Sequence, residues 1–329
     1  MSNKNILTRP VIICLLAGIC CLLWGSAFPC VKIGYSLFHI AGTDTAGQLL
    51  FAGCRFSIAG ILILIFAFLY NLIPAAHADT ADKITPPKTN LIPRNFTTWK
   101  QIIILSLFQT IAQYFFFYIG LAHTSGVKAS IIEGTNVFVA ILTASLIFHQ
   151  EKLTSKKISG CLIGFIGVVI INLGDGGINM SFQLNGEGFI FISTIAYAFS
   201  CVIMKNFSKH SNPVLLSGWQ FFFGGLVLMA AGLFLGGTLR LSTMPQTGML
   251  LYLAFISAGA YTLWSILLKY NPVSSVSVYG FMNPVFGVIL SYVLLKDSSQ
   301  ALGIQSILAL LLVCAGIYIV NHVPMTESR

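Results

Sequence analysis

Ten apolar runs follow one another along the chain, and short polar segments separate them. A run of about 20 apolar residues crosses a bilayer core of roughly 30 Å as a helix that rises about 1.5 Å per residue. The composition agrees, because 56% of the 329 residues are hydrophobic and only 8% are charged, whereas soluble domains carry about 25% charged residues. The sequence therefore predicts an all-α polytopic membrane protein.

The first apolar run continues through Trp24 past any clean small-residue cleavage site, so we interpret it as a retained helix and not as a signal peptide. An even number of spans places both termini on one side of the membrane. The predicted membrane helices are Val11–Tyr35, Ala46–Asn71, Gln101–Leu121, Gly126–Phe148, Ile158–Leu173, Gly188–Met204, Val214–Leu235, Thr247–Leu268, Ser274–Leu295 and Ala301–Val320.

Lysine and arginine are concentrated in alternate connecting segments. With the N-terminus inside, thirteen of the eighteen lie in inner segments and four in outer ones, while Arg55 lies within the second span. Cytoplasmic loops carry such an excess of positive residues. We therefore predict a multi-pass protein of the cytoplasmic membrane with cytoplasmic N- and C-termini. The proline-containing segment 72–98 is expected to be a flexible cytoplasmic linker.

Several classes of function do not fit the composition. The net charge of +9 does not indicate nucleic-acid binding, because no basic stripe with interleaved aromatic residues occurs. The eight cysteines lie in or at the ends of apolar runs without a C-x-x-C pair, which is typical of small buried side chains and not of disulfides or metal ligands. No nucleotide-binding loop occurs either. We predict no metal and no cofactor.

The chain contains an internal repeat. Trp24–Lys32 has the same eight-residue spacing as Tyr197–Lys205, and Leu105–Phe138 aligns with Leu253–Phe286 to within one residue at its start. Each half then holds five spans. Because five is odd, the second half enters the membrane from the opposite face and is inverted, an arrangement found in many secondary transporters. The predicted repeats are residues 11–173 and 186–320.

A set of ordered motifs in the first half resembles a known family, and the second half also fits it. The motifs are Trp24-Gly25-Ser26, the pattern Leu50, Arg55 and Phe56, the turn Glu151–Thr154, and the glycines Gly160, Gly164 and Gly167. This set is similar to the EamA domain of the drug/metabolite transporter superfamily. The second half departs from the pattern, with Tyr197 where tryptophan is usual and Asp297 near the expected glutamate. The resemblance implies a ten-helix carrier, like the bacterial amino-acid and metabolite exporters, that moves small solutes by alternating access.

The run 126–148 carries an acidic residue, Glu133, at membrane depth. A charged side chain there costs on the order of 3 kcal/mol even on lenient scales, and it is kept where a bundle interior or a watery cavity receives it. The Gly134–Asn136 segment that follows is expected to weaken the helix locally. The alternative is a carboxylate that a lysine or arginine neutralises for packing alone.

A second charged residue, Arg55, is expected at the same membrane depth as Glu133. Arg55 is nine residues from Ala46, and Glu133 is seven residues from Gly126, so both are expected roughly 10–14 Å below the outer surface. Trp24 and Ser26 share this layer. Facing one cavity, the guanidinium and the carboxylate can hold the two ends of an amino-acid zwitterion, and the carboxylate can carry a proton. Alternatively, the two residues pair with each other, or Arg55 is structural.

Further polar and aromatic residues are candidates for the cavity lining, because unpaired amides in hydrocarbon are costly. The Asn283-Pro284 pair is expected to break the ninth span, and broken helices in carriers lie near the binding site. Glu151, in contrast, is expected to form a charge pair at a helix end. The remaining candidates are Gln109, Gln113, Tyr114, Tyr197, Gln220, Tyr261, Trp264 and Tyr279.

The sequence thus favours a secondary transporter of small metabolites, with the lipid bilayer, a small-molecule solute and protons as partners. A membrane sensor or structural protein without flux is a second hypothesis, because most spans are plainly apolar. An integral-membrane enzyme is a third, but Glu133 is the only embedded acid, so paired catalytic carboxylates are missing. We predict that the protein is not an enzyme.

Overall fold

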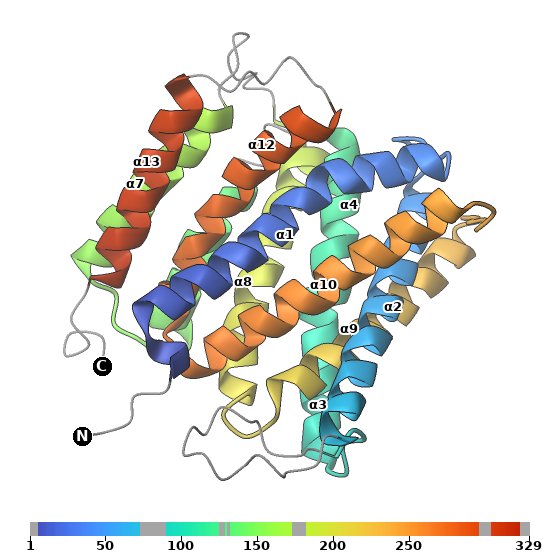
Figure 1. Cartoon of the computed structure of the whole chain (residues 1–329), viewed down its shortest axis with the longest axis horizontal. Helices are drawn as coiled ribbons and strands as arrows, with labels where there is room; N and C mark the ends of the chain where they lie inside the picture. The colour runs from blue at the N-terminus through green and yellow to red at the C-terminus, as the bar shows by residue number, and fades with distance from the viewer. Residues whose placement is uncertain are drawn as a thin grey trace.

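The computed structural model describes residues 6–72, 90–124, 129, 132–172, 182–295 and 304–322, and within these ranges the regular elements are all helices (Figure 1). Most of the predicted linker 72–98 and the residue Asp297 lie outside them. In chain order the elements are η1 (Ile6–Thr8), α1 (Pro10–Leu37), α2 (Thr45–Leu72), α3 (Phe96–Leu105), η2 (Ser106–Ala112), α4 (Gln113–His123), α6 (Asn136–Leu142), η3 (Thr143–Ile147), α7 (Ser155–Asn172), η4 (Leu184–Gly188), α8 (Phe189–Phe207), α9 (Pro213–Phe234), α10 (Met244–Tyr270), α11 (Val273–Ser277), η5 (Val278–Phe281), α12 (Met282–Leu295) and α13 (Ile304–Asn321).

Six helical stretches among the described residues are long and apolar enough to cross a membrane. They overlap six of the predicted spans, so the all-α polytopic prediction is confirmed at this level. The other four predicted spans fall on shorter or interrupted helices, and the total of ten passes stays a prediction. The six stretches are Pro10–Leu37, Thr45–Asn71, Phe96–Leu121, Leu184–Phe207, Pro213–Phe234 and Met244–Tyr270.

The helices form one bundle with two distinguishable ends (Figure 1). We call the end at which α1 begins, at Pro10, the proximal end, and the end at which α1 finishes, at Leu37, the distal end. The side chain of Asn271, which follows α10, donates from Nδ2 to the Leu7 carbonyl oxygen at 3.0 Å. This contact places the finish of α10 beside the start of α1, at the proximal end.

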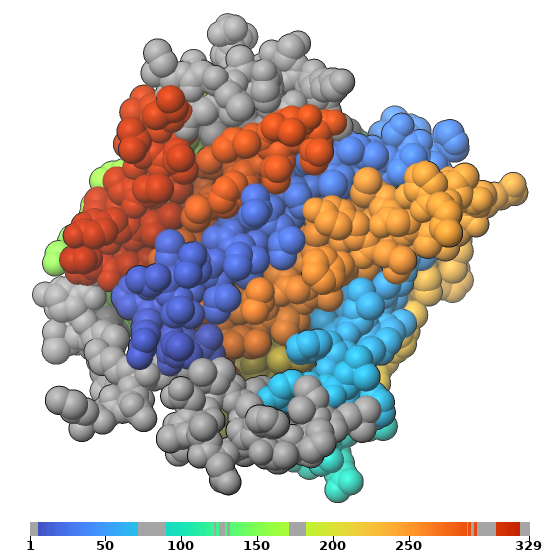
Figure 2. Space-filling model, in the orientation of Figure 1, coloured from blue at the N-terminus to red at the C-terminus, as the bar shows by residue number. Residues whose placement is uncertain are grey.

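One face of the bundle is built from α13, α12, α1 and α10, which lie next to one another (Figure 2). Large apolar side chains point outward from this face, among them Leu15 of α1, Phe255 of α10 and Leu311 of α13. Such a surface would be unfavourable in water and is favourable against lipid tails. It is the membrane-facing side of these helices.

The closest helix packing joins α2 to α9, and glycine makes it possible. A methyl group on Gly225 of α9 would lie only 2.4 Å from the Ser57 amide nitrogen, and one on Gly60 of α2 only 2.4 Å from the Phe222 amide nitrogen. The α7 and α13 helices approach similarly, since a methyl group on Gly316 would lie 2.5 Å from the Gly160 carbonyl oxygen. Membrane helices commonly use small residues in this way.

Several helices of the bundle are irregular. Pro29 lies inside α1, where it removes one backbone donor. Thr135 forms a turn between the helical residues 132–134 and the start of α6, as expected for the segment after Glu133. The irregular turn of the ninth predicted span is η5, which precedes Asn283-Pro284. Because Pro284 cannot donate to the Gly280 carbonyl, the helix tightens before the pair, and the pair itself lies in the first turn of α12.

The α2–α9 contact yields a stability prediction. Replacing Gly225 with alanine should lower the thermal unfolding temperature in detergent, because the new methyl group forces the helices apart at a cost of about 1–3 kcal/mol. The matched control is Gly248→Ala in α10, where an added methyl group meets no atom within 4 Å. That control should be neutral or slightly stabilising. Equal unfolding temperatures for both variants would contradict the proposed packing.

Candidate functional site

A cavity of about 190 Å³ lies inside the bundle. It extends from Trp24, in the middle of α1, towards Tyr35 near the distal end of that helix. Residues on α1, α2, α4, α8, α10 and α12 and on the segment leading into α6 line it: Trp24, Ala27, Phe28, Val31, Lys32, Tyr35, Arg55, Gln113, Tyr114, Phe117, Tyr118, Leu121, Ala129, Glu133, Asn136, Ser193, Thr194, Tyr197, Tyr261, Asn283, Pro284 and Gly287.

The α1 helix presents a single face to the cavity. Trp24, Phe28, Val31 and Tyr35 follow one another at intervals of three or four residues, so helical geometry places them in one stripe. The opposite stripe of α1 carries the exposed apolar residues that face lipid. This division explains why aromatic residues of α1 form one wall of the cavity.

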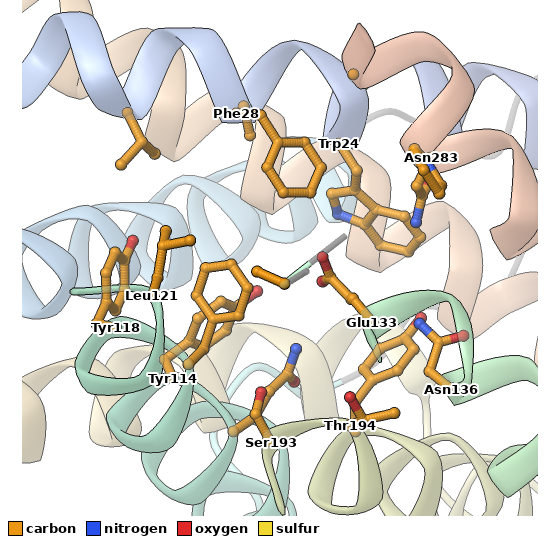
Figure 3. Close-up of a pocket in the computed structure, with 18 of the residues that line it drawn as sticks. Trp24, Phe28, Tyr114, Tyr118, Leu121, Glu133, Asn136, Ser193, Thr194 and Asn283 are labelled. Carbon is orange, nitrogen blue, oxygen red and sulfur yellow. The ribbon is translucent and has the colours of Figure 1, made fainter. Parts of the chain in front are cut away.

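Glu133 points into the middle of the cavity, towards Trp24 (Figure 3). The chain turns immediately after it, where the Thr135 hydroxyl donates to the Ile132 carbonyl oxygen at 2.6 Å and the Thr135 amide donates to the same oxygen at 2.9 Å. Among the described residues, no lysine or arginine forms an ion pair with this carboxylate. Its position thus leaves the carboxylate available to a ligand or a proton.

Arg55 reaches the same cavity from α2 and is only 4% exposed. Its Nε donates to the Leu253 carbonyl oxygen at 3.2 Å and to the Ser257 hydroxyl oxygen at 3.0 Å, both on α10. Arginine carries five N–H donors, so these two contacts orient the guanidinium while its terminal amino groups can still meet a ligand. The cavity lining therefore contains two cationic residues, Lys32 and Arg55, and the acidic residue Glu133, and no ion pair joins them among the described residues.

Aromatic side chains enclose the space between these charges. The Trp24 ring packs edge-on against Tyr261 and Trp264, with centroid distances of 4.9 and 5.0 Å, and it also meets Tyr197 at 6.5 Å. The Tyr114 and Tyr261 hydroxyl groups are hydrogen-bonded to each other. Trp24 and Tyr197 also pack against both apolar clusters of the core. The wall of the cavity is consequently continuous with the hydrophobic core.

Four buried polar atoms in the cavity lining lack a hydrogen-bond partner among the described residues: Trp24 Nε1, the Tyr35 hydroxyl oxygen, Gln113 Oε1 and Asn283 Oδ1. Leaving such an atom unpaired costs about 1–3 kcal/mol. The indole nitrogen can only donate and the two amide oxygens can accept. Together with Glu133 and Arg55, these atoms give the cavity both hydrogen-bond donors and acceptors for a small polar ligand.

The remaining sequence candidates lie outside the cavity lining. The Ser26 hydroxyl donates to the Leu23 carbonyl oxygen at 2.7 Å and lies 3.1 Å from the Tyr252 hydroxyl. Gln220 accepts from the Thr110 hydroxyl at 2.7 Å, between η2 and α9. Gln109, Trp264 and Tyr279 are buried in the surrounding core. The structure therefore gathers eight of the thirteen candidates around the cavity: Trp24, Arg55, Gln113, Tyr114, Glu133, Tyr197, Tyr261 and Asn283.

Several lining residues were not among the sequence candidates. Ser193 and Thr194 lie about one turn before Tyr197 on α8, and Phe28 lies one turn after Trp24 on α1. Helical spacing from the candidates could have identified them. Asn136, just after the turn at Thr135, is the last residue of the predicted weak segment, but it was not among the cavity candidates. In the sequence, Lys32 was counted only among the lysines and arginines of the outer connecting segments.

The anchoring of Arg55 by α10 yields a second stability prediction. Ser257→Ala removes the hydroxyl that accepts from Arg55 Nε, and it should cost about 1–2 kcal/mol of unfolding free energy because that donor loses a buried acceptor. The matched control is Thr247→Ala, an exposed hydroxyl that bonds only within α10. Thermal unfolding of both variants in detergent measures the difference. Identical stabilities would mean that Ser257 does not hold the guanidinium.

The apolar exterior, the membrane-length helices and the cavity with its charged and polar lining residues define a multi-pass membrane protein with a cavity inside the helix bundle. A model of the EamA-like transporter family matches residues 11–173 and 184–322. The chain therefore belongs to the EamA-like transporter family. The resemblance inferred from the motifs is confirmed, and the protein is a transporter and not an enzyme.

Individual relatives are more distant. A WAT1-related chloroplast protein of Arabidopsis thaliana is 27% identical over 78% of this chain, but the match spans only 62% of that protein. An uncharacterized transporter of Archaeoglobus fulgidus is 26% identical, with 90% of this chain and 94% of that protein covered. A solved structure described simply as a crystal structure of a protein shares the fold, with a TM-score of 0.70, 18% identity and coverage of 93% of this chain and 95% of that one.

Proposed function

We propose that the protein is a secondary transporter that moves small metabolites, of the amino-acid class or related to it, across the cytoplasmic membrane by alternating access. The observation that carries this proposal is the cavity in which Arg55 and Glu133 face a common space without pairing with each other. Charged side chains at membrane depth are costly, and proteins keep them where a solute or ion visits.

The chemistry of the two charged groups favours a zwitterion. The Arg55 guanidinium offers a planar fork of donors that matches a carboxylate. Glu133 can accept from an ammonium group, and the unpartnered oxygen of Asn283 lies in the same lining. Aromatic faces such as that of Trp24 attract a cation or cover an apolar side chain.

The size of the cavity supports a small solute. Its volume is about 190 Å³. Pockets for drug-sized ligands begin at about 300 Å³. A metabolite of amino-acid size fits this space better than a larger drug-like molecule.

We propose ten membrane passes in two inverted repeats, with cytoplasmic termini. The family model matches two successive regions of the chain, and residues of both regions line the cavity. This arrangement is common in secondary transporters, where the solute site lies between repeats near the midplane. The excess of lysine and arginine in alternate segments supports the orientation.

The proton role of Glu133 is tested by substitution. In proteoliposomes loaded with amino-acid mixtures, Glu133→Gln should abolish the pH dependence of transport and lower its rate, because an amide cannot take up or release a proton. Glu133→Asp, which keeps the carboxyl group, is the control and should retain part of the pH dependence. Transport by Glu133→Gln at the native rate and with the native pH profile would end this assignment.

Arg55 is tested separately as the carboxylate-binding group. Arg55→Ala should raise the concentration of solute needed for half-maximal transport about tenfold or more, because a charged hydrogen bond is worth about 1.5–3 kcal/mol. Arg55→Lys keeps the charge but loses the fork and should be intermediate. An amine that lacks a carboxylate should be insensitive to both changes. Normal amino-acid transport by Arg55→Ala would contradict the assignment of Arg55 as the carboxylate-binding group.

A further inference from the structure

A buried ion pair lies at the proximal end of the bundle, 18 residues after Glu133 in the chain. Glu151, between η3 and α7, accepts from Lys157 Nζ at 2.8 Å, and both side chains are almost fully buried. Among the described residues this is the only ion pair. Lys157 Nζ also donates to the Lys152 carbonyl oxygen at 2.7 Å. The sequence prediction of a plain helix-end charge pair did not anticipate its burial.

Glu151 also binds the other family-matched region of the chain. Its Oε1 accepts from the Ser274 amide at 2.9 Å, and its Oε2 accepts from the Ser274 hydroxyl, at the start of α11. The neighbouring Gln150 donates from Nε2 to the Val202 carbonyl oxygen of α8 at 3.3 Å. The side chains of Gln150 and Glu151 therefore fasten the region 11–173 to backbone and side-chain groups of the region 184–322.

These contacts and the cavity lie towards opposite ends of the bundle. The cavity extends from the middle of α1 to its distal end, and none of its lining residues belongs to the segment 149–154. Val276 and Phe281 lie in the chain between Ser274, which binds Glu151, and Asn283, which lines the cavity, and both are fully buried in the apolar core. The proximal end is thus closed in this conformation while the cavity approaches the distal end.

We infer that Glu151 and Ser274 form a releasable seal of the proximal end, and that solute leaves or enters the cavity on that side only after the Glu151 contacts with α11 break. This inference rests on the proposed function, because alternating access requires each end to open in turn. A carboxylate held by one serine through two hydrogen bonds is suited to this role, since it keeps its charge partner Lys157 when Ser274 departs. The backbone nearby is already strained, as His149 has a φ of 49°.

The native thiol of Cys201 reports on the seal without an engineered probe. Cys201 lies on α8 beside Val202, is 2% exposed and does not line the cavity. A small, membrane-impermeant methanethiosulfonate reagent should reach it only when the proximal end opens. The modification rate is measured by peptide mass spectrometry on the full-length chain in membrane vesicles of both orientations, with no solute present.

Glu151→Gln should increase the rate of Cys201 modification about tenfold or more from the proximal side, because it weakens two charge-assisted hydrogen bonds. Since it leaves Lys157 buried without its counter-charge, the double variant Glu151→Gln with Lys157→Met is included. Ser274→Ala removes only the hydroxyl contact and should give a smaller increase.

The matched control is Glu187→Gln at the distal end. Glu187 is also a buried carboxylate that accepts from a hydroxyl, that of Thr124 at 2.7 Å, and from a backbone amide, that of Gln183 at 2.6 Å. It should leave the Cys201 rate unchanged. An equal increase in the rate of Cys201 modification in this control would show that the whole bundle is loosened, and it would overturn the inference of a seal.

Modification of Cys201 at the native rate in folded Glu151 variants would likewise overturn the inference. If those variants do not fold, Ser274→Ala takes their place, and modification of Cys201 at the native rate in that variant would overturn it. Failure of the proposed function looks different. Cys201 modification would then rise as expected, but proteoliposomes would move no solute, so the seal would stand as a conformational contact without transport.

Discussion

The structure depends on one constraint: within a bilayer, polar groups must find their partners inside the protein. Arg55 meets this constraint through the Leu253 carbonyl and the Ser257 hydroxyl, and Lys157 meets it through Glu151. The cavity is the exception. There, Glu133 and four polar atoms remain without partners among the described residues. Because leaving them unpaired is costly, we propose that a solute supplies the missing partners.

The two buried acids illustrate different solutions of the same problem. Glu151 is surrounded by a lysine, a hydroxyl and a backbone amide, so its charge is compensated within the chain. Glu133 faces aromatic rings and open space instead (Figure 3). A compensated carboxylate holds elements together, whereas an uncompensated one recruits something from outside. Their roles in the proposed transport cycle follow from this difference in surroundings and not from residue type.

Helix periodicity and charge placement predicted much of the fold from the sequence. Apolar runs located the long helices to within a few residues, and depth arithmetic identified Trp24, Arg55 and Glu133, which line one cavity. Ser26 was placed at the same depth but faces Tyr252 on the opposite side of α1, because depth does not fix the direction of a side chain. Gln220 points towards η2, where it accepts from Thr110, for the same reason. The π-helical turn η2 just before Gln113 has no sequence signal that would have revealed it.

The glycine contact between α2 and α9 has a consequence for motion. Their backbones touch, so neither helix can slide or tilt against the other without a steric clash, and α7 is fastened to α13 in the same manner. Each of these pairs takes one helix from either family-matched region. The mechanical bodies of the molecule therefore do not coincide with its two sequence halves, and any rocking movement has to carry α2 together with α9 and α7 together with α13.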